Sequence, residues 1–432
     1  MDALKNTVRG RVLVAGEDGF EQARRPWNLA VEQPVAAVVE AADAEDVAAV
    51  VRFAKGAGPA VAPQATGHGA SGEVGGVILL RTAALDELEI RAEERIARVG
   101  AGMQWGRVQA AAEPHGLTGL PGSSPVVGVA GYTLGGGLSW FGRRYGWASD
   151  GVRAFDVVDA DGERSRVTAD TDADLFWALC GGGGSHALVT AIEYALHPAP
   201  ALYGGRMLWP AARAAEVFAA YREITATAPD ELTVWFDLLH FPGADPMVAV
   251  DATYLGDAHE GEALLAGLAG IGGLIGDGRR AMALTELAGI TAEPTAPSAG
   301  LSRGDLLTGL DDTVVEALLD EPIAPLLSVQ IRHLGGALAG PSQGAAGTLT
   351  EPYSLYMLGI PGTPERAAAV RAKQDEVVRA LGSSLSGRKP FTNLAPGDDG
   401  TTAFPAETVA RLRDIKRLRD PHGVIRGNYP LG

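Results

Sequence analysis

The sequence predicts an α+β fold built from two unlike parts. The first part begins with a strand at Pro34–Glu40, a helix whose N-cap is Asp43, and a second strand at Val61–Ala65, which together form a βαβ-like unit. The second part, beyond Pro198 and Pro200, mixes long helices with strands of alternating pattern. This mixture predicts an antiparallel sheet whose helices cover one face.

The remaining elements follow from apolar periodicity and from turn residues. In the first part we expect strands at Val77–Arg81, Leu88–Arg91, Ile96–Val99, Phe155–Asp159 and Leu188–Leu196, a strand ending at Thr168, and helices at Gln104–Glu113 and Asp172–Leu179. In the second part we expect helices at Ala211–Ala226, Glu260–Ile271 and Pro364–Leu381, and strands at Leu232–Leu239, Met247–Tyr254, Leu326–His333 and Tyr353–Ile360. Loops are expected at Ala292–Arg303 and Gly335–Thr350, and a helix at Ala406–Arg419 precedes an extended tail.

A glycine-rich segment, Gly116–Ser149, separates these patterns. It holds ten glycines and no Asp or Glu, and its only charges are Arg143 and Arg144, in a chain of net charge -17. Glycines let backbone N–H groups approach a ligand closely, and the missing carboxylates remove repulsion toward an anion. A flexible linker is the alternative, but the interleaved large apolar residues argue against it, because linkers are polar. The segment therefore predicts a cradle for a phosphate-bearing ligand.

Composition excludes several classes of function. The acidic balance and the lack of a basic patch argue against a nucleic-acid or anionic-membrane partner. No apolar run of about 18 residues is present, and the first ten residues lack the apolar core of a signal peptide. Cys180 is the only cysteine, which excludes intramolecular disulfides and predicts a cytoplasmic protein. The eight histidines show no metal-ligand spacing, so no metal is expected.

One motif imitates a dinucleotide fingerprint. The run from Val99 to Gly106 follows a strand and opens a helix, but its last glycine is one position late. No acidic residue follows at about 20 residues to hold a ribose, because Gly116–Ser149 contains none. We therefore expect these glycines to serve close packing. A nucleoside triphosphatase is not supported either, since the chain has no GxxxxGK[ST] motif.

Several segments, taken in order, resemble the flavoproteins of the vanillyl-alcohol-oxidase fold, in particular the berberine-bridge-enzyme-like branch that includes 6-hydroxynicotine oxidase. The resemblance covers nearly the whole chain. Its markers are ARRPWN, the TGHG loop, PGSSPVVGVAGYTLGGGLSW, RYGWASD, VVDADG, LFWALCGGGGS, RHLGGAL and RLRDPHGVIRGNYP. It implies a PCMH-type FAD-binding domain over residues 1–200, a substrate domain over 201–395 whose sheet roofs the isoalloxazine ring, and a C-terminal segment, 396–432, that returns to the FAD domain.

The resemblance also implies which residues contact the cofactor. His68 matches the histidine that this family bonds to the 8α-methyl group of the flavin, and a neutral imidazole is a competent nucleophile for that bond. The alternative is a loop histidine that only hydrogen-bonds a phosphate. The other expected FAD contacts are Thr66, Gly67, Gly69, Ser71, Ser124, Val127, Gly128, Gly131, Gly135, Gly136, Gly137, Gly183, Val189 and Asn428.

Departures from the family pattern refine this expectation. Ser124 stands where bicovalent members carry a second flavin-bonded cysteine, so a single covalent bond is expected. Val127 matches the position that controls oxygen access, where valine goes with oxidase behaviour; an ordinary packing valine is the alternative. Gln64 stands where the family carries an arginine, four residues before this histidine, which leaves the pyrophosphate to backbone amides and helix ends. Phe391 replaces a tyrosine near the flavin, so the catalytic base must come from elsewhere.

The expected reaction is hydride transfer from a small organic substrate, of the secondary-metabolite kind, to flavin N5, with reoxidation by O2 giving H2O2. Tyr353, Tyr356, Asp237, His240 and His333 are the candidates for a base. Strand alternation places Asp237 and His240 on opposite faces, but the sequence does not say which face sees the flavin. For each of them a satisfied core or solvated side chain is the alternative.

Two other functions stay open at this point: a redox-neutral cyclase on the same FAD scaffold, and a flavin-binding protein without turnover. The expected partners are the small-molecule substrate and O2, with a homodimer left open and with neither nucleic acid nor membrane.

Overall fold

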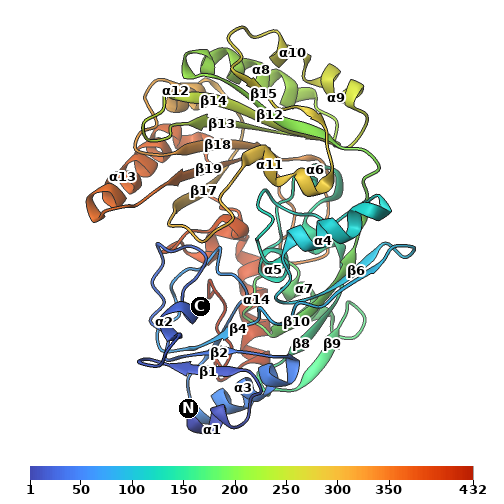
Figure 1. Ribbon diagram of the computed structural model, residues 1–432, viewed down its shortest axis with the longest axis vertical. Coiled ribbons are helices and arrows are strands. Elements are labelled where there is room, and N and C mark those ends of the chain that lie inside the picture. Colours follow the sequence, from blue (N-terminus) through green and yellow to red (C-terminus); the bar gives the residue numbers. More distant parts are fainter. Residues whose placement is uncertain (432) are drawn as a thin grey trace.

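The computed structural model describes residues 1–431 and confirms the α+β fold (Figure 1). The first sheet has the strand order β1-β2-β4-β3. Strands β2 and β3 both pair with β4 in parallel, and the helix between them starts at the N-cap Asp43, whose carboxylate accepts from two backbone amides. These elements are α1 (Asp2–Lys5), β1 (Arg11–Val14), α2 (Phe20–Ala23), β2 (Ala37–Glu40), α3 (Ala44–Ala57), β3 (Val61–Gln64) and β4 (Ile78–Arg81).

A second, antiparallel sheet lies beside the first and has the order β5-β6-β10-β8-β9. The bounds of its strands are β5 (Leu88–Arg91), β6 (Ile96–Gly100), β8 (Val152–Val158), β9 (Arg164–Val167) and β10 (Leu188–Ala195). Helices α4 (Trp105–Ala112) and α7 (Ala173–Leu179) accompany it, and the short strands β7 (Leu117–Thr118) and β11 (His197–Pro198) pair with each other.

The glycines of the false dinucleotide motif pack as expected. A Cβ at Gly100 would lie 2.2 Å from the carbonyl oxygen of Leu85, and one at Gly102 would lie 2.3 Å from that of Thr82. The glycine-rich segment contains two short helices that the sequence did not predict, α5 (Val129–Leu134) and α6 (Gly142–Tyr145).

The second part is one eight-stranded antiparallel sheet, drawn at the top of Figure 1. Its order is β15-β12-β14-β13-β18-β19-β17, and β16 also pairs with β12. The strands are β12 (Tyr203–Pro210), β13 (Leu232–Leu239), β14 (Met247–Tyr254), β15 (Gly276–Asp277), β16 (Arg280–Ala281), β17 (Leu301–Leu307), β18 (Ser328–His333) and β19 (Tyr353–Gly359).

The longer helices cover one face of this sheet, as predicted, whereas the four-residue α11 packs near Trp235 on the other face. Strand side chains such as Phe236, Ile331 and Leu355 pack with Phe218 of α8 and Val314 of α12 in the largest hydrophobic cluster. We call the opposite side the inner face; it carries the alternate residues of each strand and is turned toward the first part (Figure 1). The helices of this part are α8 (Ala214–Thr227), α9 (Ala258–Leu264), α10 (Ala266–Ala269), α11 (Ala288–Thr291), α12 (Asp312–Leu319) and α13 (Pro364–Leu381).

Some expectations for the second part were wrong. Strand β12 and helix α12 were not predicted, and the single helix expected at Glu260–Ile271 is two short helices, because the backbone of Leu265, with φ -100° and ψ 10°, is not helical. The loop expected at Ala292–Arg303 ends early, since β17 begins at Leu301 and pairs along its whole length with β19.

The chain ends beside the first sheet. Helix α14 (Ala406–Arg419) is followed by a tail in which Ile425 bridges to Val61 of β3 and the amide of Arg426 donates to the Val61 carbonyl. Asp420, 3% exposed, fixes this turn by accepting from the amides of Val424 and Ile425. The tail thus lies next to the loop that leaves β3.

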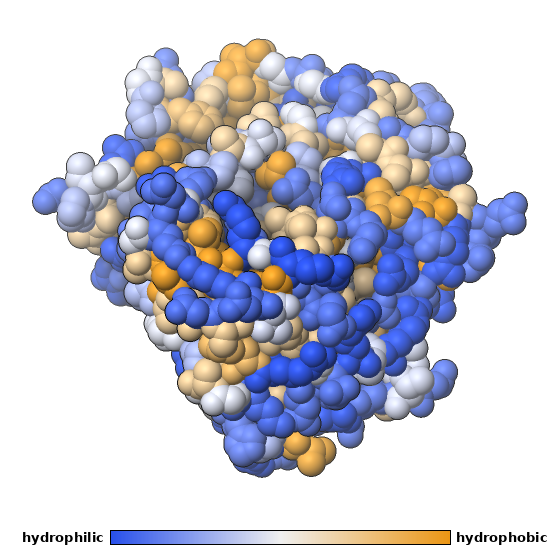
Figure 2. All heavy atoms as spheres, turned by 60° about the horizontal axis from the view of Figure 1, so that its bottom comes forward, coloured by the Kyte–Doolittle hydropathy of each residue, from blue (hydrophilic) through white to orange (hydrophobic). Residues whose placement is uncertain are grey.

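The face of the molecule in Figure 2 is mostly hydrophilic, with hydrophobic side chains in scattered patches. Among residues 1–431, no helix has the length and apolar content that crossing a membrane requires.

Candidate functional site

The loop that follows β3, Thr66–Gly72, carries His68, and we call it the histidine loop. Gly67 has φ +83°, and a Cβ there would lie 2.8 Å from Pro26, so the turn before His68 requires glycine. The indole of Trp27 stacks on the His68 imidazole with centroids 4.3 Å apart. The ring of His68 is therefore held in one orientation by a tight turn and an aromatic neighbour.

One ring nitrogen of His68 has a hydrogen-bond partner among residues 1–431, and the other has none. Nδ1 lies 2.7 Å from the Thr66 hydroxyl, whereas Nε2 is buried and has no hydrogen-bond partner among residues 1–431. Burial lowers the pKa of His68 to about 4, so the imidazole is neutral near pH 7. A neutral ring with a buried, unpartnered nitrogen is the state that a nucleophile or an acceptor requires.

The C-terminal tail fastens the histidine loop. The side-chain oxygen of Asn428 accepts from the amide of Ser71 at 2.9 Å, and its side-chain nitrogen donates to the carbonyl of Gly69. The hydroxyl of Ser71 donates to the backbone carbonyl of Asn428. Asn428 thus positions the loop that carries His68, while Asn428 itself is exposed.

Six of the eight glycines predicted to contact the cofactor divide into two groups. In the first group a Cβ would strike an aromatic side chain: at Gly135 and Gly183 it would meet Phe391, at Gly136 Trp147 and at Gly137 Tyr132, all within 2.5–3.2 Å. Close packing accounts for these four glycines.

The second group borders open space. A Cβ at Gly131 would meet nothing within 4 Å in the described chain, and one at Gly69 would only reach the Asn428 side chain at 4.0 Å. Both residues are exposed, although Gly131 lies in a largely buried segment. Gly128, the N-cap of α5, lies against Ala65 and Thr66, which puts the start of α5 beside the histidine loop.

The remaining predicted contacts are buried or half-buried near this place. The Ser124 hydroxyl is buried without a partner in the part of the chain that the structure describes, as is the Thr133 hydroxyl of α5. Val127 is half-buried, and its carbonyl accepts from the amide of Trp105. Val189 packs in the hydrophobic core of the second sheet, at a register shift in β10, so its side chain is accounted for by packing.

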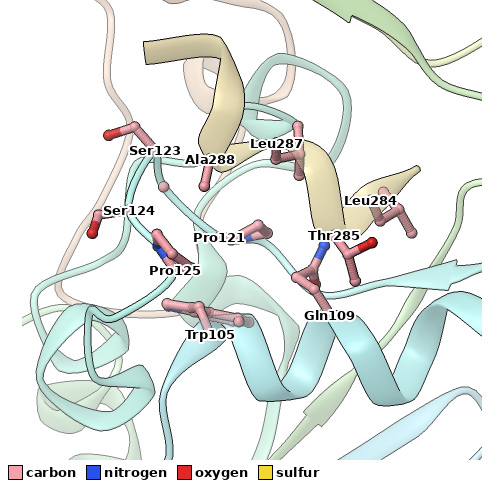
Figure 3. Close-up of a pocket in the computed structure, with 12 residues that line it drawn as sticks. Trp105, Gln109, Pro121, Ser123, Ser124, Pro125, Leu284, Thr285, Leu287 and Ala288 are labelled. Atoms are coloured by element: carbon pink, nitrogen blue, oxygen red, sulfur yellow. The ribbon is translucent and has the colours of Figure 1, made fainter. Parts of the chain in front are cut away.

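A small pocket borders the turn Pro121–Pro125, which contains Ser124. It is formed by α4, by the turn Pro121–Pro125 and by the segment Leu284–Ala288 of the second part (Figure 3). Its volume of about 30 Å³ has room for roughly one or two water molecules. The pocket is therefore a gap between the two parts of the chain and too small for an organic substrate.

The inner face of the eight-stranded sheet carries a buried polar cluster. Arg206 of β12 donates two hydrogen bonds to Asp251 of β14, at 2.6 and 2.7 Å. Asp237 of β13, 3% exposed, accepts from the Ser328 hydroxyl at 2.6 Å and lies 3.5 Å from Arg206. Burial, together with repulsion from Asp251, raises the pKa of Asp237 to about 7.

Arg332 of β18 lies next to this cluster. Its guanidinium lies over the rings of Trp235 and Tyr356, with its central carbon 4.4 and 4.8 Å from the two centroids. Its Nε donates to the side-chain oxygen of Gln330 at 2.6 Å. Burial lowers the pKa of Arg332 and raises that of Tyr356.

The structure separates the candidates for a base. Asp237 and Tyr356 lie on the same row of the inner face, joined through Gln330, because Asp237 pairs with Gln330 and Gln330 pairs with Tyr356. Tyr353 points to the opposite face, where its hydroxyl lies 2.8 Å from that of Thr225 on α8.

Two further candidates also lie away from that row. His240 follows the end of β13, outside the sheet. His333 is buried among Arg143 and Tyr353 on the helix-covered side. The structure therefore does not support Tyr353, His240 or His333 as the base. Tyr353 and His333 lie on the helix-covered face, and His240 lies beyond the end of β13.

The inner face lies opposite the glycine-rich segment. Trp140 of that segment stacks on Trp235 of β13 with centroids 3.6 Å apart. Asn28, next to the Trp27 that stacks on His68, bridges to Ser298 and hydrogen-bonds Gly300 of the loop before β17. The histidine loop, α5 and the inner face therefore border one region between the two parts.

Comparisons with known proteins agree with this geometry. Residues 35–168 match the family model of an FAD binding domain. The (R)-6-hydroxynicotine oxidase of Paenarthrobacter nicotinovorans is 25% identical over 466 residues, which cover 98% of this chain and 97% of that protein. The chain has the fold of the berberine-bridge-enzyme-like flavoproteins. It is an FAD-linked oxidoreductase.

Other relatives resemble this flavoenzyme in part or in fold. An FAD-dependent monooxygenase of Cochliobolus heterostrophus is 37% identical over 179 residues, 40% of this chain but only 34% of that protein. A solved structure of the wild-type BBE-like 1 protein of Physcomitrella patens superposes with a TM-score of 0.87 at 19% identity, covering 100% of this chain and 99% of that one.

The residues present fit FAD. The unpartnered buried atoms His68 Nε2, Ser124 Oγ and Thr133 Oγ1, together with the open space at Gly69 and Gly131, all lie along the histidine loop and the glycine-rich segment. A ligand rich in hydrogen-bonding groups would satisfy these atoms. Sequence reasoning missed Arg332 and Gln330 of the inner face, because it did not identify which side of β18 the helices cover.

Proposed function

We propose that this flavoenzyme is an oxidase that dehydrogenates a small organic substrate beneath the inner face. FAD held by the histidine loop and the glycine-rich segment would supply a hydride acceptor for the substrate and a two-electron donor to O2, which with two protons would give H2O2. The proposal rests on the placement of three elements, the histidine loop, α5 and the inner face, around one region. This placement brings the loop that would hold the flavin opposite the buried polar cluster of the inner face.

His68 is proposed as the single covalent attachment point of the flavin. Its neutral ring and its unpartnered buried nitrogen favour bond formation to an activated methyl group. The hydroxyl of Ser124, unlike a thiol, does not supply a second link. Thr66 and the stacked Trp27 would hold the imidazole in place for the bond.

Asp237 is proposed as the base that takes the proton released when the substrate is oxidised. A group whose pKa lies near 7 is matched to proton transfer at neutral pH, and the inner face presents Asp237 toward the region where substrate would bind. Tyr356, on the same row, is the second candidate. Because its pKa is raised, its hydroxyl is protonated at pH 7 and does not accept a proton there, which makes it the weaker choice.

Acid precipitation followed by a denaturing gel tests the covalent bond. The wild-type band should show flavin fluorescence, and His68→Ala should release its flavin into the supernatant. Thr168→Ala, in the turn after β9, where the hydroxyl hydrogen-bonds Asp170 and Thr171, is the control and should keep the fluorescent band. Free flavin from the wild type would instead leave His68 as a residue that only hydrogen-bonds the cofactor.

Anaerobic mixing with substrate distinguishes the oxidase from the redox-neutral cyclase. An oxidase substrate bleaches the flavin absorbance without O2 and yields one H2O2 per turnover when O2 is admitted. Product formed without bleaching would favour the cyclase. A panel of alcohols, amines and sugars that gives neither bleaching nor product would favour a flavin-binding protein without turnover.

A further inference from the structure

The inner face holds a cation, Arg332, whose charge no carboxylate of residues 1–431 neutralises. Two other arginines, Arg206 and Arg143, have several partners: Arg206 donates twice to Asp251, and Arg143 donates to the carbonyls of Leu232, Leu334 and Ala228. By contrast, Arg332 makes one hydrogen bond, from Nε to Gln330, and forms no ion pair within 4.0 Å among residues 1–431.

The free part of Arg332 is its pair of terminal nitrogens. The guanidinium lies over the rings of Trp235 and Tyr356, and Gln330 accepts a hydrogen bond only from its Nε. The two Nη groups donate to no partner in the described chain, yet they are not fully enclosed. They therefore present two N–H donors to accessible space in the geometry that a carboxylate matches.

The nearest carboxylates do not fill this role. Asp237 and Glu293 influence the charge of Arg332, but both lie beyond ion-pair distance. Asp237 is held by Ser328, and Glu293 is an exposed residue of the loop before β17. A guanidinium in a desolvated place without a carboxylate partner is costly, and the carboxylate of a bound ligand would lower that cost.

We propose that Arg332 binds the substrate and that the substrate is an organic acid, whose carboxylate meets the two free Nη groups. The ring of Tyr356, with Tyr132 of α5 nearby, favours an aromatic or conjugated acid over a sugar or an aliphatic amine. This inference rests on the proposed function, because it assigns the substrate class of the same region.

The test is calorimetric titration of the flavin-loaded protein with benzoate and with the uncharged benzamide. Benzoate should bind the wild type more tightly than benzamide does. Arg332→Gln should weaken benzoate binding about ten- to a hundredfold, the equivalent of losing a charge-assisted hydrogen-bonded pair, and leave benzamide unchanged. Arg303→Gln changes an arginine of β17 that is paired with Asp375 on the helix-covered side; it is the matched control and should behave as wild type.

Two results would overturn the inference. One is equal affinity for benzoate and benzamide, or no binding of benzoate, in the wild type. The other is a lowered flavin midpoint potential in Arg332→Gln with benzoate affinity retained, which would assign the charge to the flavin. If Arg332→Gln does not fold, Arg332→Lys takes its place, because lysine keeps the charge but lacks the paired donors. We then expect a benzoate affinity between that of the wild type and complete loss. Wild-type affinity in Arg332→Lys would contradict the proposal.

Binding in this experiment needs no turnover. A failure to bind benzoate therefore rejects the substrate class, whereas an absence of H2O2 with a substrate that does bind rejects the oxidase.

Discussion

Replacement of Asp237 by Asn should change how the stability of the protein depends on pH. Asp237 is 3% exposed on the inner face and lies beside Asp251, so its ionised form is disfavoured by burial first and by repulsion second. Its pKa rises from 3.8 to about 7 in the folded protein. The amide of Asn has the same shape, cannot ionise, and can still hydrogen-bond Ser328.

The sign follows from the number of bound protons. Between pH 3.8 and about 7 the folded state keeps a proton on Asp237 that the unfolded state has lost. Because the folded state binds more protons, the unfolding free energy falls as pH rises through this range. The rise in pKa corresponds to roughly 4 kcal/mol as an upper bound, at about 1.4 kcal/mol for each pH unit. In Asp237→Asn this contribution is absent.

The assay is urea unfolding of wild type and Asp237→Asn at pH 5 and at pH 8, with the flavin loaded in both. The stability of wild type relative to the variant should be lower at pH 8 than at pH 5, by up to about 4 kcal/mol. Asp312→Asn, whose carboxylate is 92% exposed, is the control and should show no such change. An equal difference at both pH values would refute the raised pKa.

The same variant should slow flavin reduction about 10²- to 10⁴-fold if Asp237 is the base.

The remaining predictions concern the cofactor region. Asn428→Ala removes two side-chain hydrogen bonds to the histidine loop, so purified protein should carry less covalent flavin per chain by absorbance, whereas unchanged flavin content would show that the loop holds itself. Gly137→Ala should lower the unfolding free energy by about 2 kcal/mol or more, because Gly137 has φ +80° and a Cβ would lie 2.5 Å from Tyr132. Gly131→Ala is its counterpart: the helical position has open space, so melting in the absence of flavin should be unchanged or higher, while flavin content should fall if the cofactor lies against α5. A Gly131→Ala protein with full flavin content would contradict that placement.

The sequence by itself determined the local elements and the class of cofactor. Helix α13 and strands β13 and β14 were predicted with their observed bounds, because apolar periodicity and the flanking turn residues are local signals. The Asp43 cap was predicted for the same reason. The glycine-rich segment indicated a phosphate-bearing ligand, and the resemblance of the motifs in order implied FAD, in agreement with the FAD binding domain matched over residues 35–168.

The tertiary structure alone decided which side chains meet. Strand alternation says that Tyr353 and Tyr356 point to opposite faces, but only the packing of α8 and α12 shows that Tyr356 is the one on the inner face. Short pieces such as α5 were missed because glycine gives weak helix signals. The sequence also could not show that Arg332 lacks a carboxylate partner. An ion pair depends on distances between side chains on different strands, and the sheet register sets those distances.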